Sequence, residues 1–183
     1  MINNIYLCGH AGSGKSYCAE YLKKKGYIIA NVAYPIYNLA YDYFNMDHKV
    51  KDRKLLQTIS IDVARNYDND IWLTRFFQDI RIVRRTRELL EMPECSFITA
   101  DCRFINEHKM FQYHKWTGIY LDVSEEICIK RLHERDNTAQ HNTLTHATEV
   151  AIDEFKHELV WIDASGTLQN MYDNLDVAIT KGE

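Results

Sequence analysis

A glycine-rich segment near the amino terminus constrains this sequence more than any other feature. Gly9-His10-Ala11-Gly12-Ser13-Gly14-Lys15-Ser16 stands between an apolar run at residues 5–8 and a stretch of helical character at residues 16–25. In such a segment the backbone N–H groups curl around a polyphosphate, the lysine reaches the outer phosphates and the serine ligates Mg²⁺. The segment therefore predicts a strand, a phosphate-binding loop and a helix that together bind a nucleoside triphosphate. A turn that only joins strand to helix is the alternative, and the complete motif in its context disfavours it.

Short apolar runs alternate with helical stretches along the rest of the chain, without an internal repeat or an obvious linker. We expect strands at residues 5–8, 26–31, 96–100, 118–123 and 159–163, and helices at residues 16–25, 36–45, 51–67, 70–90, 107–114, 124–135, 149–155 and 167–179. This alternation favours a parallel sheet with helices on both faces. Residues 136–148 have little periodic apolar content and predict a mobile segment or a lid. The chain length of 183 residues fits a single domain.

Charge and cysteine usage exclude several classes of protein. The formal net charge is -4, so there is no overall basic surface of the kind that holds duplex nucleic acid by counterion release. None of the 5 cysteines forms a C-x-x-C pair, which predicts reduced thiols rather than a disulfide framework or a zinc site. There is no export signal and no run of about 18 apolar residues, so we expect a soluble cytoplasmic protein without a membrane partner.

Two polar residues follow the strand expected at residues 96–100. In an open parallel sheet ligands collect at the carboxyl ends of the strands. Asp101 would supply the oxygen ligand that Mg²⁺ prefers, and Arg103 would hold a second phosphate through a planar two-point contact. The alternative is that Asp101 caps a helix and Arg103 is a surface arginine.

Two further groups of arginines lie on expected helices. Arg131 and Arg135 are four residues apart, so both face one way and would clamp a transferring phosphoryl group. The alternative for Arg131 is a surface ion pair with Glu134. The denser cluster, Arg81, Arg84, Arg85 and Arg87, predicts a solvated helix face or a dimer interface rather than a catalytic site.

With these residues in view, the chain resembles the P-loop nucleoside monophosphate kinase superfamily, and more closely the phage-type deoxynucleoside monophosphate kinases. The likeness spans almost the whole chain, and its segments occur in the family's order. The segments are Leu7 to Ser16, Ala33-Tyr34-Pro35-Ile36, Leu55-Leu56-Gln57 with Asp62 and Arg65, Asp70-Ile71-Trp72, Asp101 to Phe104 with Asn106 and Glu107, His146 with Thr148 and Glu149, and Asp163 to Leu168. Only the loop at residues 9–16 is specific by itself.

The resemblance implies a fold and an activity. The fold is a three-layer α/β/α P-loop kinase fold, with a five-stranded parallel sheet in the order 2-3-1-4-5 and a mobile lid at about residues 131–148. The activity is transfer of the γ-phosphoryl group of ATP, with Mg²⁺, to a (deoxy)nucleoside monophosphate, which would bind to the helical region at about residues 34–92. A phage-encoded member would act in the host cytoplasm.

The resemblance also implies roles for individual residues. Lys15, Asp101, Arg131 and Arg135 would be catalytic, and Ser16 and Asp101 would hold the metal. ATP would be bound by Gly9, His10, Ala11, Gly12, Ser13, Gly14, Lys15, Ser16, Arg131, Ser165 and Gly166. The monophosphate would be bound by Tyr34, Gln57, Arg65, Trp72, Arg103 and Glu149. The partners would be small-molecule nucleotides, with a homodimer through residues 81–90 as a further expectation.

One departure from the family leaves the acceptor open. A lysine usually follows the proline-containing segment, whereas Tyr37 occupies that place here. The aromatic stretch Tyr34, Tyr37, Tyr41, Tyr43 and Phe44 would either stack on a base or form part of a core. The alternatives are a P-loop kinase of another small acceptor, such as dephospho-coenzyme A or a sugar acid, and a nucleotide-sensing ATP-binding module.

Overall fold

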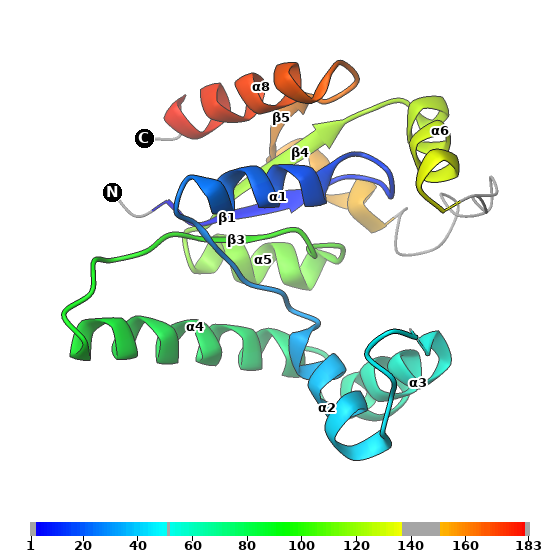
Figure 1. The fold of residues 1–183 in the computed structure, drawn as a ribbon, viewed down its shortest axis with the longest axis vertical. Coiled ribbons are helices and arrows are strands. Elements are labelled where there is room, and N and C mark those ends of the chain that lie inside the picture. Colours follow the sequence, from blue (N-terminus) through cyan, green and yellow to red (C-terminus); the bar gives the residue numbers. More distant parts are fainter. Residues whose placement is uncertain (1–2, 51, 137–150, 182–183) are drawn as a thin grey trace. The chain divides into compact units, whose positions relative to one another are not determined.

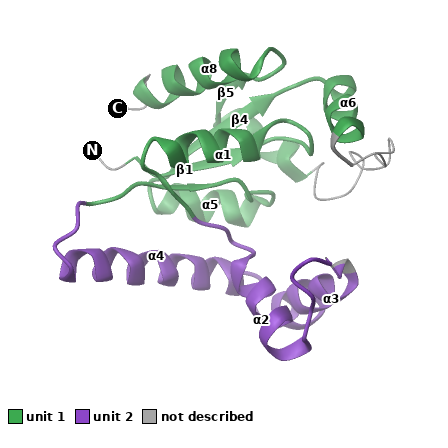
Figure 2. Ribbon diagram, in the orientation of Figure 1, with its two compact units in different colours: residues 1–29, 94–183 green, residues 30–93 purple. Residues whose placement is uncertain are grey.

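The computed structural model describes residues 3–50, 52–136 and 151–181, and their contacts divide the chain into two compact units. Unit 1 contains Met1–Ile29 and Glu94–Glu183, and unit 2 contains Ala30–Pro93 (Figure 2). Unit 2 coincides closely with the helical region for which the resemblance implies acceptor binding. The expected single domain stays a prediction.

All the described strands belong to unit 1 and form one parallel sheet in the order β2-β3-β1-β4-β5. The strands are β1 (Ile5–Cys8), β2 (Ile28–Ile29), β3 (Phe97–Thr99), β4 (Thr117–Asp122) and β5 (Val160–Asp163). The central strand β1 pairs with β3 through Ile5 and Ile98, and with β4 through Ile5 and Thr117. The predicted sheet and its strand order are confirmed. Because every pair is parallel, the carboxyl ends of the strands share one edge.

Helices cover both faces of this sheet (Figure 1). One face packs against α1 (Lys15–Lys24), α6 (Glu125–Asp136) and α8 (Leu168–Lys181), and α5 (Ile105–Tyr113) lies on the other face. The side chains of β1 alternate accordingly: Ile5 and Leu7 join the core under α1 and α8, while the ring of Tyr6 stacks on Phe111 of α5 at 4.8 Å. The last helical piece expected before β5 forms two 3₁₀ turns, η3 (Ala151–Glu154) and η4 (Lys156–Glu158).

A polar chain that runs from the buried Tyr6 and His108 to the exposed Glu158 ties β1, α5 and η4 together. The Tyr6 hydroxyl lies 2.9 Å from His108 Nδ1, and His108 Nε2 lies 3.1 Å from Glu158 Oε2. Burial raises the pKa of Tyr6, so the phenol keeps its proton. The hydrogen bond from His108 lowers the pKa of the Glu158 carboxyl.

We predict that Gly118→Ala destabilises unit 1 through this same layer. A Cβ at position 118 of β4 would lie 2.4 Å from the Tyr6 ring and 2.5 Å from Leu159 Cδ2. Since Tyr6 is fixed by His108 and Phe111, the ring has little room to move. Overpacking of this kind costs about 1–3 kcal/mol, or a fall of roughly 2–12 °C in Tm. Gly166→Ala, whose Cβ would lie no closer than 3.3 Å to Asn170, is the control for thermal unfolding. An equal Tm for the two variants would contradict this packing.

The regular elements in the described part of unit 2 are all helices. They are α2 (Tyr34–Phe44), α3 (Arg53–Gln57), the π-helix η1 (Thr58–Arg65) and α4 (Ile71–Leu89). The helix predicted over residues 51–67 is confirmed from residue 53 onward, and its middle part is a π-helix. The run contains Thr58, Ile59, Ile61 and Val63, whose β-branched side chains crowd the preceding turn of an α-helix, and the wider π turn relieves that crowding.

The outer face of α4 carries the predicted arginine cluster together with apolar side chains. Arg85 pairs with Glu88 at 2.7 Å, and Arg87 donates to the carbonyl of Pro93. Ile82 and Leu89 are exposed beside them. A homodimer through this face stays a prediction.

None of the described helices combines the length and the apolar character needed to cross a membrane.

Candidate functional site

The loop between β1 and α1 has the backbone that its glycines predict. Gly9, Gly12 and Gly14 have φ values of +144°, +86° and +105°. At Gly14 a side chain would be strained because φ lies in the left-handed region, and the flexible side chain of Met171 would have to shift, since a Cβ would lie 2.9 Å from its sulfur. The loop ends where α1 begins, at Lys15, so the unpaired N–H groups and the dipole of α1 favour an anion there.

The ammonium group of Lys15 is held by this loop. Lys15 Nζ donates to the carbonyl oxygen of Gly9 and, at 2.8 Å, to that of His10, and it lies 3.5 Å from Ser13 Oγ. All three acceptors lie within residues 9–13, so the positive charge sits in the curve of the loop. Because an ammonium has three donors, Lys15 can exchange one carbonyl for a phosphate oxygen and still hold the loop.

Helix α6 packs directly on the same loop. A Cβ on Gly12 would lie 2.5 Å from the carbonyl oxygen of Cys128, so the two backbones approach more closely than a side chain at position 12 would allow. One turn further along α6, Arg131 Nη1 donates to the carbonyl of Ser13 at 3.4 Å. The helix that carries Arg131 is therefore seated on the backbone of the phosphate-binding loop.

Arg131 also reaches the turn after β5. Its Nη2 donates to the carbonyl of Ala164 at 2.9 Å and to that of Gly166 at 3.4 Å. The guanidinium thus joins two segments that the sequence assigned to ATP. These carbonyl contacts replace the surface ion pair with Glu134 as the explanation of this side chain.

The turn after β5 is fixed by its own side chains. Asp163 Oδ1 accepts from Ser165 N at 2.9 Å and from the Ser165 hydroxyl, and these bonds lower the pKa of Asp163. Thr167 and Asn170 cap the start of α8 reciprocally: Thr167 N donates to Asn170 Oδ1 at 3.3 Å, and Asn170 N donates to Thr167 Oγ1 at 3.2 Å. The turn therefore presents a defined row of backbone groups at the edge of the sheet.

Asp101 and Arg103 follow β3 at the same edge. Because β3 pairs with β1, their loop and the phosphate-binding loop leave adjacent strands. Arg103 is exposed and Asp101 is half-buried. The N-cap of α5 is Phe104, so Asp101 does not cap that helix. Their roles with metal and phosphate stay predictions.

Two buried cysteines lie beside these loops, Cys8 at the end of β1 and Cys102 after β3. Burial raises the pKa of Cys102 well above its ordinary value, and the neighbouring Cys8 raises it further. A thiol without thiolate character is a poor nucleophile, so Cys102 serves packing rather than chemistry.

The residues assigned to the monophosphate side, other than Arg103 and Glu149, lie in unit 2. Trp72 is only 6% exposed and donates its indole N–H to the carbonyl of Ser60 at 3.1 Å, which gives it a packing role in that unit. Tyr34 and Gln57 are exposed, and Arg65 is the last residue of η1. The binding roles of these four residues stay predictions.

Several predicted features lie outside the described residues. They are Glu149 and the part of the expected lid at residues 137–148. The structure describes the backbone of Arg135 in α6 but not its side chain.

Sequence reasoning assigned no role to two residues that shape the site. One is Cys128, whose carbonyl meets Gly12, and no sequence signal indicates that contact. The other is Glu107, which accepts hydrogen bonds from the loop after β3. An acidic residue in the first turn of α5 is the signal that a capping analysis could have used.

Comparisons with known proteins identify a family and similar folds. A family model described as an AAA domain matches residues 5–151, which run from β1 to the start of η3. No curated protein matches the chain.

Among solved structures, three similar folds are those of a gluconokinase from Sinorhizobium meliloti 1021, the protein TT1252 from Thermus thermophilus and a sugar kinase from Janibacter sp. HTCC2649. The gluconokinase has a TM-score of 0.60 and 16% identity, over 98% of this chain and 92% of that chain. TT1252 has a TM-score of 0.58 and 14% identity, over 98% and 97% of the two chains. The sugar kinase has a TM-score of 0.57 and 12% identity, over 98% and 95%. At these identities the likeness is one of fold, that of a P-loop kinase.

Proposed function

The chain belongs to the AAA domain family, and from this premise we propose that it is a small-molecule kinase that transfers the γ-phosphoryl group of ATP to a (deoxy)nucleoside monophosphate. One observation carries the proposal. Arg131 joins the phosphate-binding loop to the turn after β5, so a cationic side chain connects the two segments that would hold the phosphates and the base of one donor nucleotide.

On the donor side, each group has a distinct task. The N–H groups of the loop and the start of α1 would bind the phosphates, and the Lys15 ammonium would exchange one loop carbonyl for an oxygen of the outer phosphate. The turn at Ser165 and Gly166 would lie along the adenine ring. Arg131 would keep these two binding segments in register when ATP arrives.

The residues present also fit Mg²⁺. Ser16 supplies a hydroxyl in the first turn of α1, and Asp101 supplies a carboxylate after the neighbouring strand; both are oxygen ligands of the kind a hard cation prefers. The described residues contain no cluster of three or more His, Cys, Asp and Glu side chains that would hold a metal by themselves. Phosphate oxygens and water would therefore complete the coordination, as is usual for this ion. When bound, Mg²⁺ neutralises charge that develops on the phosphates.

Transfer to a monophosphate needs alignment more than base catalysis. An ionised phosphate oxygen is already a nucleophile, so the side chains have to hold it in line with the γ-phosphorus and to offset negative charge. Arg103 would hold the acceptor phosphate, and Arg135 would reach the transferring group. Closure of a lid would keep water from competing with the acceptor.

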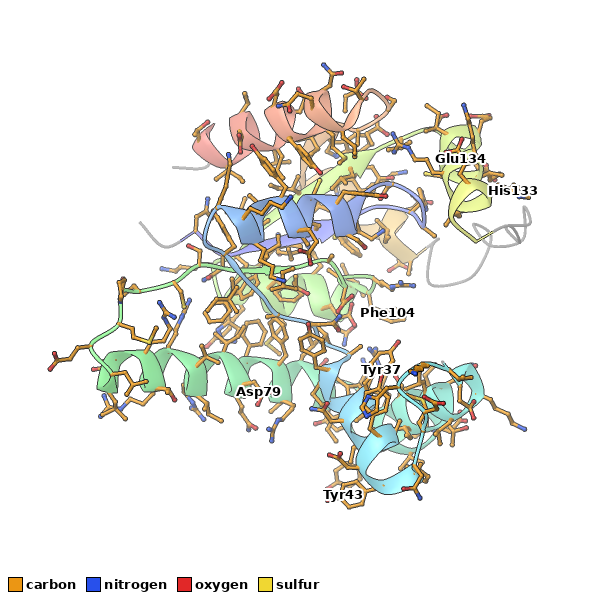
Figure 3. All side chains as sticks on the ribbon, viewed as in Figure 1. Tyr37, Tyr43, Asp79, Phe104, His133 and Glu134 are labelled. Atoms are coloured by element: carbon orange, nitrogen blue, oxygen red, sulfur yellow. The ribbon has the colours of Figure 1, made fainter. Side chains whose placement is uncertain are left out.

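A face of α2 favours a nucleotide as the acceptor. Tyr34, Tyr37 and Tyr41 are spaced as i, i+3 and i+7, and the rings of Tyr37 and Tyr41 lie 6.0 Å apart. The buried residues of α2 are Ile36 and Ala40, so the three tyrosines are not the main core stripe of this helix. Tyr37 is labelled in Figure 3. Aromatic rings offer a flat apolar face on which a planar base can stack.

A kinase of a sugar acid is the second candidate, because the similar folds include a gluconokinase and a sugar kinase. One experiment separates the candidates. The chain is incubated with ATP and Mg²⁺, and with deoxynucleoside monophosphates, ribonucleoside monophosphates, dephospho-coenzyme A, gluconate or no acceptor in parallel. ADP formation and the mass of the phosphorylated acceptor are measured.

We expect ADP to form at a rate that depends on a nucleoside monophosphate, with a matching diphosphate product. Phosphorylation of gluconate or dephospho-coenzyme A alone would replace the proposed acceptor and keep the kinase. Slow ADP formation that no acceptor changes would instead favour a nucleotide-sensing module.

A further inference from the structure

Glu107 is a buried acid that the proposed mechanism does not use. It is the third residue of α5, and only 2% of its surface is exposed. Its Oε2 accepts from the backbone N–H of Arg103 at 2.7 Å and from that of Phe104 at 3.2 Å. These two N–H groups belong to the end of the loop that begins with Asp101.

The hydrogen bonds of Glu107 reach beyond the ordinary cap of α5. In a capping box, an acidic residue at the third helical position accepts from the backbone N–H of the N-cap. Glu107 makes this bond to Phe104, the N-cap, and a second one to Arg103, one residue earlier in the loop. Burying a carboxylate costs free energy that hydrogen bonds must offset, and the bond to Arg103 ties the loop rather than the helix.

We infer that Glu107 is a positioning residue, which fixes the backbone of Arg103 and Phe104 so that Asp101 and Arg103 keep their orientation toward the nucleotides. This inference rests on the proposed function. Asp101 is two residues before the first anchored N–H group, and the second anchor, Phe104, stands directly before α5 (Figure 3). A loop held at its end by two hydrogen bonds to one rigid helix has few conformations left. A displacement of about 1 Å at reacting groups can cost about 100-fold in rate, so the loss of these anchors has a kinetic consequence.

The test compares Glu107→Gln and Glu107→Ala with a matched control at the other end of β3. Asn4 Oδ1 accepts from the backbone N–H of Phe97 at 2.9 Å, and Asn4 is 7% exposed. Asn4→Ala therefore removes the same kind of buried bond, from side chain to backbone, at the amino end of the strand and away from the loops. Tm, amide hydrogen exchange and steady-state kinetics are measured for all variants.

Glu107→Gln keeps the shape of the side chain but replaces the charged acceptor by a weaker, neutral amide oxygen, so we expect faster exchange at Arg103 and Phe104. The KM for the monophosphate should rise about tenfold and kcat should fall, while the affinity for Mg·ATP in calorimetry stays within about twofold. Glu107→Ala should enlarge these effects if it folds. Asn4→Ala should lower Tm and leave exchange at Arg103 and Phe104, KM and kcat unchanged.

Three outcomes would overturn the inference. The first is unchanged exchange at Arg103 and Phe104 in Glu107→Gln, which tests the anchoring without any reference to activity. The second is faster exchange with unchanged KM and kcat. The third is an equal kinetic defect in Asn4→Ala, which would make Glu107 a general stabiliser. If the wild-type chain phosphorylates none of the acceptors, the proposed function itself fails, and Glu107 is then a cap of α5 alone.

Discussion

Replacement of Lys15 by alanine should lower kcat/KM for phosphoryl transfer by about 100- to 1,000-fold, the range seen when one donor to a developing negative charge is removed. The Lys15 ammonium already lies in the curve of the loop, within hydrogen-bond distance of the Gly9 and His10 carbonyls. No other described lysine is bonded to this loop. The variant should still fold, because the bonds of the Lys15 ammonium to the Gly9 and His10 carbonyls and to the Ser13 hydroxyl are only partly buried, so water can take its place.

Lys24→Ala is the matched control for this prediction. Lys24 is exposed in the last turn of the same helix, so it carries the same charged group as Lys15 but at the opposite end of α1 from the loop. Rates with saturating acceptor, ADP release and Tm should separate the two variants, with Lys24→Ala close to wild type. If Lys15→Ala kept more than a tenth of the wild-type kcat/KM with every acceptor, the role of Lys15 would be wrong.

The strands of the sheet could be predicted from the sequence because the signals for them are local. Each strand is a short apolar run that is followed or preceded by a helical stretch, and the glycines at residues 9–14 leave one way to connect the first run to the first helix. A parallel sheet then brings the residues after each strand to one edge. This reasoning placed three features at that edge: Asp101, Arg103 and the turn at residues 163–167.

The contacts that assemble the site were not predictable, because they join residues far apart in the chain. The bond from Arg131 to the Ser13 carbonyl spans 118 residues, and a pattern of charges four residues apart cannot distinguish a carbonyl from a neighbouring Glu134 as the acceptor. The indole bond of Trp72 to the Ser60 carbonyl was not predictable either, because a tryptophan in an apolar helical stretch carries no signal of the acceptor that its N–H reaches.

Gly12→Ala should weaken Mg·ATP binding by about 10- to 100-fold, because a Cβ at position 12 has no space against α6. It would lie 2.5 Å from the Cys128 carbonyl. Overpacking costs about 1–3 kcal/mol, and 1.4 kcal/mol corresponds to a tenfold change in affinity. The φ of +86° adds strain of about 1–2 kcal/mol, which lowers folding stability. Relief of the contact requires the loop or α6 to shift, which lengthens the bond between Arg131 and Ser13.

Gly26→Ala separates the two causes. Gly26 has a φ of +96°, but a Cβ there would meet nothing within 4 Å. This control should therefore lose about 1 kcal/mol of folding stability from strain and keep its affinity for Mg·ATP in calorimetry. Since strain alone is common to both variants, a loss of affinity confined to Gly12→Ala would assign the effect to the packing of α6 on the loop. Equal affinities in the two variants would refute that packing as a determinant of nucleotide binding.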